Sequence, residues 1–193
     1  RRKYKEASDT LLPPPAPFPE MAEMSCGEVL TCLSEHDMLD ASAAMKATRR
    51  TFLIGNELYF KKNIFSEDVE WFFRYAPLLQ SIVTLNFPAY CYRIRKDSIS
   101  HSLTEKNVRD LFSSIETHAE AIRDGDSENK AALLNYMAYQ YYIVLGLCRN
   151  VLRGSARRAL FVRLRRYRWL TKYSISGKTK KCALLVSLCG VRL

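Results

Sequence analysis

Apolar residues recur at steps of three and four over two long stretches in the middle of the chain. The first follows Thr104, which can cap a helix, and its apolar face holds Val108, Leu111, Phe112, Ile115, Ala119 and Ile122. The second opens at Ser127 and runs to about Val151, and its buried side is expected to hold Leu134, Met137, Tyr141, Val144, Leu145 and Cys148. This pattern predicts a pair of helices over 104–152.

Shorter helices are predicted on the N-terminal side of this pair. Ser25 and Glu28 form a capping-box pattern, which indicates that a short helix covers about 26–35. Residues 69–80 also have helical spacing, although a proline weakens the last turn. Residues 41–50 are compatible with one further helix.

Two apolar runs suggest strands rather than helices. Residues 81–87 and 89–94 are rich in β-branched and aromatic side chains, and Pro88 separates them. At the N-terminus, five prolines between Pro13 and Pro19 exclude a helix. We therefore expect residues 1–25 to form a loop or linker.

Charge is distributed unevenly along the chain. The net charge is +10, but residues 1–130 hold 17 Lys and Arg against all 20 Asp and Glu, whereas residues 131–193 hold 13 Lys and Arg and no acid. In residues 153–193 basic residues alternate with apolar ones, as in helices that lie on an anionic membrane surface. A solvated basic helix and a nucleic-acid contact are the other interpretations, and nucleic acid is the least favoured. The membrane interpretation predicts a cytoplasmic protein held peripherally on the inner face of the cell membrane.

Several signals for metal or phosphate sites fail on spacing. The six cysteines include no C-x-x-C pair and the three histidines lie far apart, so no metal site is expected in this chain. The fragment SGKT at 176–179 resembles the end of a phosphate-binding loop, but the glycine that the motif requires is replaced by Lys172.

An acidic group precedes the predicted helix at 69–80. Glu67, Asp68 and Glu70 follow Ser66 and border an aromatic segment. Acids in the first turn of a helix stabilise its positive end, and Ser66 can cap it, so these residues have a structural interpretation. The alternative is that one carboxylate is a catalytic base.

The surroundings of this group resemble a known family. The matching residues are Phe52, Leu53, Ile54, Asn56, Leu58, Tyr59, Phe60, Glu67, Asp68, Trp71, Pro88, Tyr90, Tyr92, Arg93, Arg95, Ser98 and Ile99. In this order, over residues 41–102, they resemble the C-terminal half of bacterial family 2 glycosyltransferases. The resemblance implies an α/β fold of the GT-A (Rossmann-like) type, here its helix-rich acceptor-side part over 26–103, followed by the helical pair at 104–152 and the basic amphipathic tail at 153–193.

The resemblance also implies roles for individual residues. Asp68 would be the general base of an inverting sugar transfer, and Glu67 would orient it or bind an acceptor hydroxyl. Trp71 and Lys46 would contact substrate. The segment containing Arg93, Arg95, Ser98 and His101 would approach the diphosphate of a nucleotide-sugar or its metal, and the alternative is that this segment is a solvated basic loop.

The family's nucleotide-binding half has no counterpart in this sequence. The acids that hold Mg²⁺ or Mn²⁺ in the intact enzyme are therefore expected outside this chain, and we expect the chain to be a fragment that is inactive alone. The acceptor would be a saccharide or a lipid-linked saccharide. The alternative is a non-enzymatic basic helical module that binds nucleic acid or a protein partner.

Overall fold

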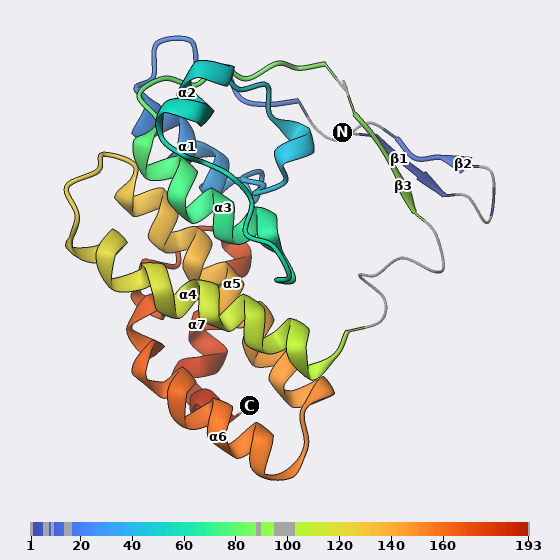
Figure 1. Ribbon diagram of the computed structural model, residues 1–193, viewed down its shortest axis with the longest axis vertical. Helices are drawn as coiled ribbons and strands as arrows, with labels where there is room; N and C mark the ends of the chain where they lie inside the picture. The colour runs from blue at the N-terminus through green and yellow to red at the C-terminus, as the bar shows by residue number, and fades with distance from the viewer. Residues whose placement is uncertain are drawn as a thin grey trace.

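The computed structural model describes residues 2–5, 8, 10–13, 17–87, 90–94 and 103–192. Its centre is an antiparallel pair of long helices, α4 (Glu105–Asp124) and α5 (Lys130–Val151), which lie side by side (Figure 1). A capping box of Thr104 and Asn107 starts α4, as the sequence predicts for Thr104. All six residues predicted for the apolar face of each helix are buried. The predicted helical pair is confirmed.

The start of α5 lies a few residues later than the sequence predicts. Its N-cap is Asn129, which makes no capping bond to its own helix. Instead, its side-chain Nδ2 donates to the carbonyl oxygens of Ala76, at 2.8 Å, and Leu79, at 2.9 Å. Ser127 donates its hydroxyl to the carbonyl of Pro77 at 3.0 Å. The turn between the two long helices is thereby joined to the segment that follows α3.

Helix α3 (Glu67–Tyr75) and helix α1 (Cys26–Glu35) pack against the central pair. The capping box predicted for α1 is present. Helix α3 stops earlier than predicted, and a 3-10 turn, η3 (Ala76–Leu78), follows it, because Pro77 has no N–H for a further α-helical hydrogen bond. Phe72, on α3, is fully buried in a core shared with α4 and α5.

The C-terminal third belongs to the same core. It forms α6 (Gly154–Arg166), η5 (Arg168–Tyr173), α7 (Gly177–Cys189) and η6 (Gly190–Arg192). Buried side chains from these elements join the core of α3, α4 and α5, among them Leu160, Leu164, Leu170 and Val186. The basic tail is thus folded onto α5 by the apolar residues that alternate with its charges.

The strands are short and lie apart from the helical body (Figure 1). They are β1 (Arg2–Lys5), β2 (Thr10–Leu11) and β3 (Cys91–Ile94), in the order β2-β1-β3. β1 pairs antiparallel with β2 and parallel with β3. β3 confirms the strand predicted at 89–94, whereas β1 and β2 fall within a segment expected to be loop throughout. The helix-rich character is confirmed, and an open GT-A sheet is not seen among the described residues.

Two local predictions are wrong. Residues 41–50 form only a 3-10 turn, η2 (Ala43–Met45), and the α-helix, α2 (Arg50–Gly55), begins where the predicted one ends. Residues 81–87 are extended but pair with no strand among the described residues. Val83, Leu85 and Phe87 are exposed to 83%, 70% and 72%, whereas Ile82 is partly buried against the residues of α1.

A search of the described residues for a helix long and apolar enough to cross a bilayer finds no such segment.

Candidate active site

The loop before α3 is held in place by α4. Asp110 accepts a hydrogen bond from the Phe65 backbone N–H at 2.9 Å, and Lys106 donates to the Asn63 carbonyl at 2.7 Å. Ser66 then takes a left-handed conformation, with φ 57° and ψ 45°. The predicted capping by Ser66 is wrong, because its side chain makes no cap bond and only its carbonyl accepts, from the N–H groups of Val69 and Glu70. This loop fixes where the acids of the first turn point.

Asp68 is half-buried in the first turn of α3. Burial raises the pKa of this carboxyl, and the nearby charges of Glu67 and Asp40 raise it further. A hydrogen bond from the Val69 backbone N–H acts in the opposite direction. A carboxylate whose pKa is raised accepts a proton more readily than an ordinary aspartate does. Glu67 itself is exposed beside it.

Lys46 lies near the same carboxylate. Its Nζ donates to the carbonyl oxygens of Asp40 and Ser42, and it stands 5.1 Å from the centre of the Phe72 ring. Burial lowers the pKa of Lys46 to about 8, and the negative charges of Asp40 and Asp68 oppose part of that fall. The two predicted site residues Asp68 and Lys46, 22 positions apart in the sequence, are therefore brought together. We refer to Asp40, Lys46 and Asp68 as the Asp68 cluster.

Tyr136 connects the Asp68 cluster to a neighbouring pocket. This residue of α5 is 6% exposed, and its pKa is raised by burial and then by the charges of Asp40 and Asp68. Its ring meets Phe72 edge-on, with centroids 5.2 Å apart. Asp40 and Tyr136 both line the pocket as well, so one wall is shared with the cluster.

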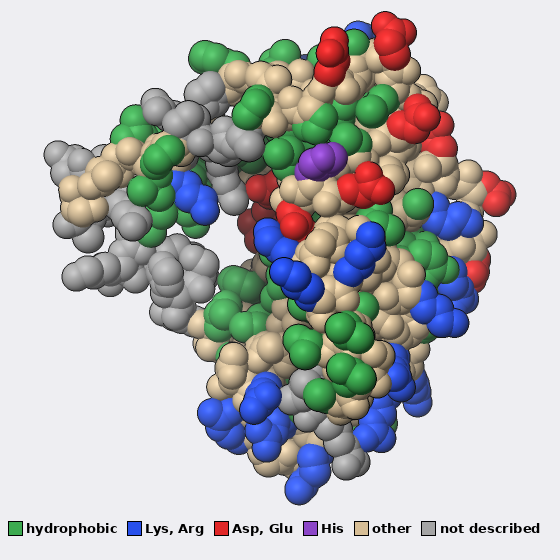
Figure 2. All heavy atoms as spheres, turned by 180° about the vertical axis from the view of Figure 1, so that it is seen from behind, with side chains coloured by type: hydrophobic (Ala, Val, Ile, Leu, Met, Phe, Trp, Pro, Cys, Tyr) green, Lys and Arg blue, Asp and Glu red, His purple; other side chains and the backbone are tan. Residues whose placement is uncertain are grey.

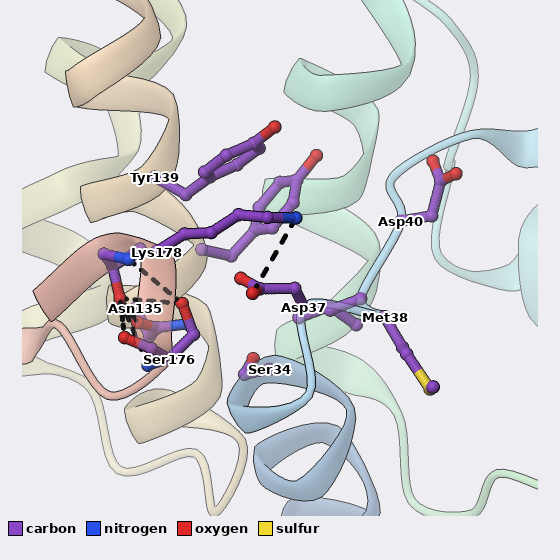
Figure 3. A pocket seen from close by; sticks show the side chains of 11 residues that line it. Ser34, Asp37, Met38, Asp40, Asn135, Tyr139, Ser176 and Lys178 are labelled. Carbon is purple, nitrogen blue, oxygen red and sulfur yellow. Dashed lines mark hydrogen bonds and ion pairs between the residues drawn. The ribbon is translucent and has the colours of Figure 1, made fainter. Parts of the chain in front are cut away.

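The pocket has a volume of about 260 Å³ and a largely polar lining, formed by Ser34, Asp37, Met38, Leu39, Asp40, Asn135, Tyr136, Tyr139, Ser176, Lys178 and Thr179. Figure 3 shows Lys178 extending from α7 toward Asp37, with the ring of Tyr139 beside it and Asp40 farther along the same loop. The Lys178 Nζ lies 3.7 Å from an Asp37 carboxylate oxygen. Tyr139 is 39% exposed, so its ring is accessible from solvent.

One wall of the pocket comes from the start of α7, which is hydrogen-bonded to α5. Ser176 and Thr179 form a capping box at the start of α7. The side-chain oxygen of Asn135 accepts from the Thr179 hydroxyl at 3.1 Å and from the Ile175 N–H at 2.9 Å. The SGKT fragment is therefore the start of a helix that packs on α5.

Glu70, the third acid of the group, has a structural role. Its side chain is 1% exposed and forms ion pairs with Lys61, at 2.7 Å, and with Arg74, at 2.8 Å. His118 Nε2 lies 3.1 Å from Glu70 Oε1, the oxygen that Lys61 also contacts. Burial alone would raise the pKa of Glu70, but the hydrogen bonds from His118, Arg74 and Lys61 hold it far below its usual range. Glu70 is therefore an acid with a structural role in the fold, as one of the two interpretations of the acidic group expects.

The other predicted site residues are not gathered around Asp68. Trp71 is 3% exposed, donates its indole N–H to the Leu58 carbonyl at 3.0 Å and stacks on Tyr75, so it packs in the core. Arg93 lies on β3, apart from the helical body. The remaining three predictions, Arg95, Ser98 and His101, lie outside the described residues.

Sequence reasoning missed the residues of the neighbouring pocket and its shared wall. Asp40, Tyr136, Tyr139 and Lys178 come from three separate parts of the chain, and no local pattern links them. For Glu70 a signal existed, because Arg74 follows it by four positions on a helix. Among the described residues, no group of three His, Cys, Asp or Glu side chains is arranged to hold a metal ion.

Comparisons of the chain with protein-family models, with curated proteins and with solved structures return no match.

Proposed function

We propose that this chain provides the acceptor-binding, base-bearing part of a glycosyltransferase that moves a sugar from a nucleotide-sugar to a saccharide or lipid-linked acceptor with inversion. The observation that carries the proposal is Asp68. It is a half-buried carboxylate with a raised pKa in the first turn of a helix, and it interacts electrostatically with Asp40 and Tyr136, which line a polar pocket. These are the properties that a general base requires.

The proposed step transfers one proton and one glycosyl group. An acceptor hydroxyl attacks the anomeric carbon of the donor from the side opposite the leaving group. Asp68 takes the hydroxyl proton as the new C–O bond forms, and the nucleoside diphosphate leaves with the electrons of the old bond. Lys46 supplies the positive charge of the cluster, because it interacts electrostatically with both Asp40 and Asp68.

The pocket suits the acceptor end of a saccharide. Sugars combine apolar ring faces with hydroxyl groups, and the lining offers the Tyr139 ring together with the polar groups of Asp37, Asn135 and Lys178. Its volume of about 260 Å³ is below the roughly 300–1,000 Å³ of pockets that hold drug-sized ligands. We therefore assign it to a single terminal sugar.

Donor binding is assigned to residues outside this chain. In a GT-A enzyme Mg²⁺ or Mn²⁺ would stabilise the diphosphate, but the described residues do not offer a ligand set that fits such an ion. The steps derived above therefore use only the side chains of this chain. The GT-A fold itself is part of the proposal, supported by the ordered resemblance over residues 41–102.

A transfer assay on the protein that carries this chain tests the proposal. Nucleotide-sugars are supplied with Mg²⁺ or Mn²⁺ and a panel of saccharide acceptors, and release of the nucleoside diphosphate is followed. We expect Asp68→Asn to lower kcat by about 10²–10⁴-fold, the usual contribution of a general base, while donor binding changes little. Turnover retained in Asp68→Asn would remove Asp68 as the base, and absence of transfer with every donor would refute the function.

A further inference from the structure

Helix α7 presents apolar side chains on both of its sides. Thr179 and Val186 are buried against the rest of the molecule. On the opposite side, Leu184, Leu185 and Leu188 are exposed to 60%, 52% and 75%. Since they follow Lys181 at steps of three, four and seven residues, all four lie on one stripe of the helix.

Positive charge lies at the N-terminal end of the stripe. Lys180 and Lys181 are exposed and have no ion-pair partner among the described residues. No acid occurs in residues 131–193, so neighbouring positions of the same chain segment do not neutralise them. Figure 2 shows hydrophobic side chains gathered in the lower part of this face and bordered by Lys and Arg, with Asp and Glu in its upper and middle parts. We call Lys180, Lys181, Leu184, Leu185 and Leu188 the α7 patch.

The chemistry of the α7 patch distinguishes between possible partners. A second copy of the chain would bring like charges together at a two-fold interface. A nucleic acid would pair with the lysines but would leave three leucines against its sugar-phosphate backbone. An anionic lipid surface accommodates both groups, because leucines enter the acyl boundary while lysine ammonium groups stay at the level of the headgroups.

We propose that α7 docks the protein on an anionic lipid surface, with the helix in the plane of the membrane and the α7 patch facing the lipid. The helix has 13 residues, and about 20 are needed to cross the hydrocarbon core, so this helix lies on the bilayer. The attraction combines apolar burial with the electrostatic pull of anionic lipid on lysine. This docking does not depend on the proposed sugar transfer.

Vesicle flotation with the 193-residue chain tests the docking. We use vesicles of phosphatidylcholine alone and vesicles in which about one third of the lipid is phosphatidylglycerol. The chain is expected to float with the anionic vesicles only, and the bound fraction should fall as salt is raised, because ions screen the lysine charges. Binding to neither kind of vesicle, or equal binding to both, would overturn the proposal.

Matched variants locate the contact. Leu184→Ser/Leu185→Ser/Leu188→Ser should lower partitioning about tenfold or more, because these side chains supply the apolar contact. The control Val83→Ser/Leu85→Ser/Phe87→Ser removes as many exposed apolar side chains from a segment without lysines and should leave partitioning unchanged. An equal loss in both triple variants would show that the α7 patch is not the contact surface.

The charged part of the α7 patch is tested separately. Lys180→Gln/Lys181→Gln should weaken binding to anionic vesicles more than Arg165→Gln/Arg166→Gln, which removes two exposed charges from α6.

A short RNA duplex serves as the competing polyanion. If the chain binds the duplex while anionic vesicles fail to compete, the surface is a nucleic-acid site and the lipid proposal is wrong. Each variant is checked for folding by far-UV circular dichroism. We expect all of them to fold, because the substituted residues are exposed.

Discussion

Replacing the buried carboxylate of Glu70 should destabilise the fold far more than replacing the exposed carboxylate three positions earlier. Glu70 is 1% exposed and is held by Lys61, Arg74 and His118. In Glu70→Gln the amide NH₂ replaces one carboxylate oxygen and faces donors, so the buried site loses the charge that balances Arg74 and Lys61, whose side chains are 25% and 49% exposed. Breaking a buried ion pair in this way costs about 3–5 kcal/mol.

The measurement is urea unfolding at pH 7, followed by far-UV circular dichroism. For Glu70→Gln we expect a loss of about 3 kcal/mol in the free energy of unfolding, with an unchanged m-value. Glu67→Gln is the matched control, because Glu67 is exposed in the same helical turn, and it should stay within about 0.5 kcal/mol of the unmodified chain.

The same variant has a defined pH dependence. The pKa of Glu70 is lowered in the folded state from its ordinary value of 4.5. Its ionisation therefore contributes stability that is present above pH 4.5 and is lost as the pH falls toward the folded-state pKa. The difference in stability between the unmodified chain and Glu70→Gln should accordingly shrink below pH 4.5. A difference below 0.5 kcal/mol at pH 7, or one that does not change on acidification, would refute the role assigned to Glu70.

Three further predictions follow from the fold and the pocket. Phe72→Ala, at a fully buried position, should lower the free energy of unfolding by about 3–5 kcal/mol in the same urea assay, and a loss below about 1 kcal/mol would contradict its place in the core. Asn135→Ala removes the acceptor for Ile175 and Thr179, so α7 amides should lose about 1–3 kcal/mol of hydrogen-exchange protection; unchanged protection would show that α7 is held otherwise. Tyr139→Ala should weaken acceptor-saccharide binding about tenfold in calorimetry, since a stacked aromatic contributes about 0.5–1.5 kcal/mol beyond its area, whereas the equally aromatic but distant Tyr59→Ala should not.

The long helices could be predicted because their pattern is local. Leu111 and Ile115 of α4 recur on one face, and helical geometry alone places them against a neighbour. The start of α5 was displaced from Ser127 because Asn129 is engaged by the carbonyl oxygens of Ala76 and Leu79, which are about 50 residues away in the sequence. A capping motif involves only residues that are close in sequence, so it does not predict tertiary contacts of this kind.

The segments predicted wrongly depend on partners that are distant in sequence. The β-branched and aromatic side chains of 81–87 are typical of a strand, but a strand also needs a neighbour to pair with, and composition does not supply one. In the same way, residues 41–50 favour a helix locally, yet Lys46 folds back on the carbonyl oxygens of Asp40 and Ser42 and the segment makes only a 3-10 turn.

The candidate site was only partly foreseeable. Asp68 stood out through its position in an ordered set of motif residues, and Lys46 was named with it. The pocket residues Tyr139 and Lys178 lie on helices that meet only after folding, so no local pattern links them to the wall that the pocket shares with the Asp68 cluster. Trp71 illustrates the opposite error, because an aromatic beside an acidic pair looks like a substrate contact and is instead buried in the core.

The pH profile of kcat/KM tests most directly the claim that Asp68 acts as an ionised base. The charge of Glu67 helps to raise the pKa of Asp68, so Glu67→Gln should move the acid limb of the profile to lower pH. Tyr59→Ala, a change away from the cluster, should leave that limb in place. An acid limb that keeps its position in Glu67→Gln would contradict the assignment of Asp68 as the group that takes the acceptor's proton.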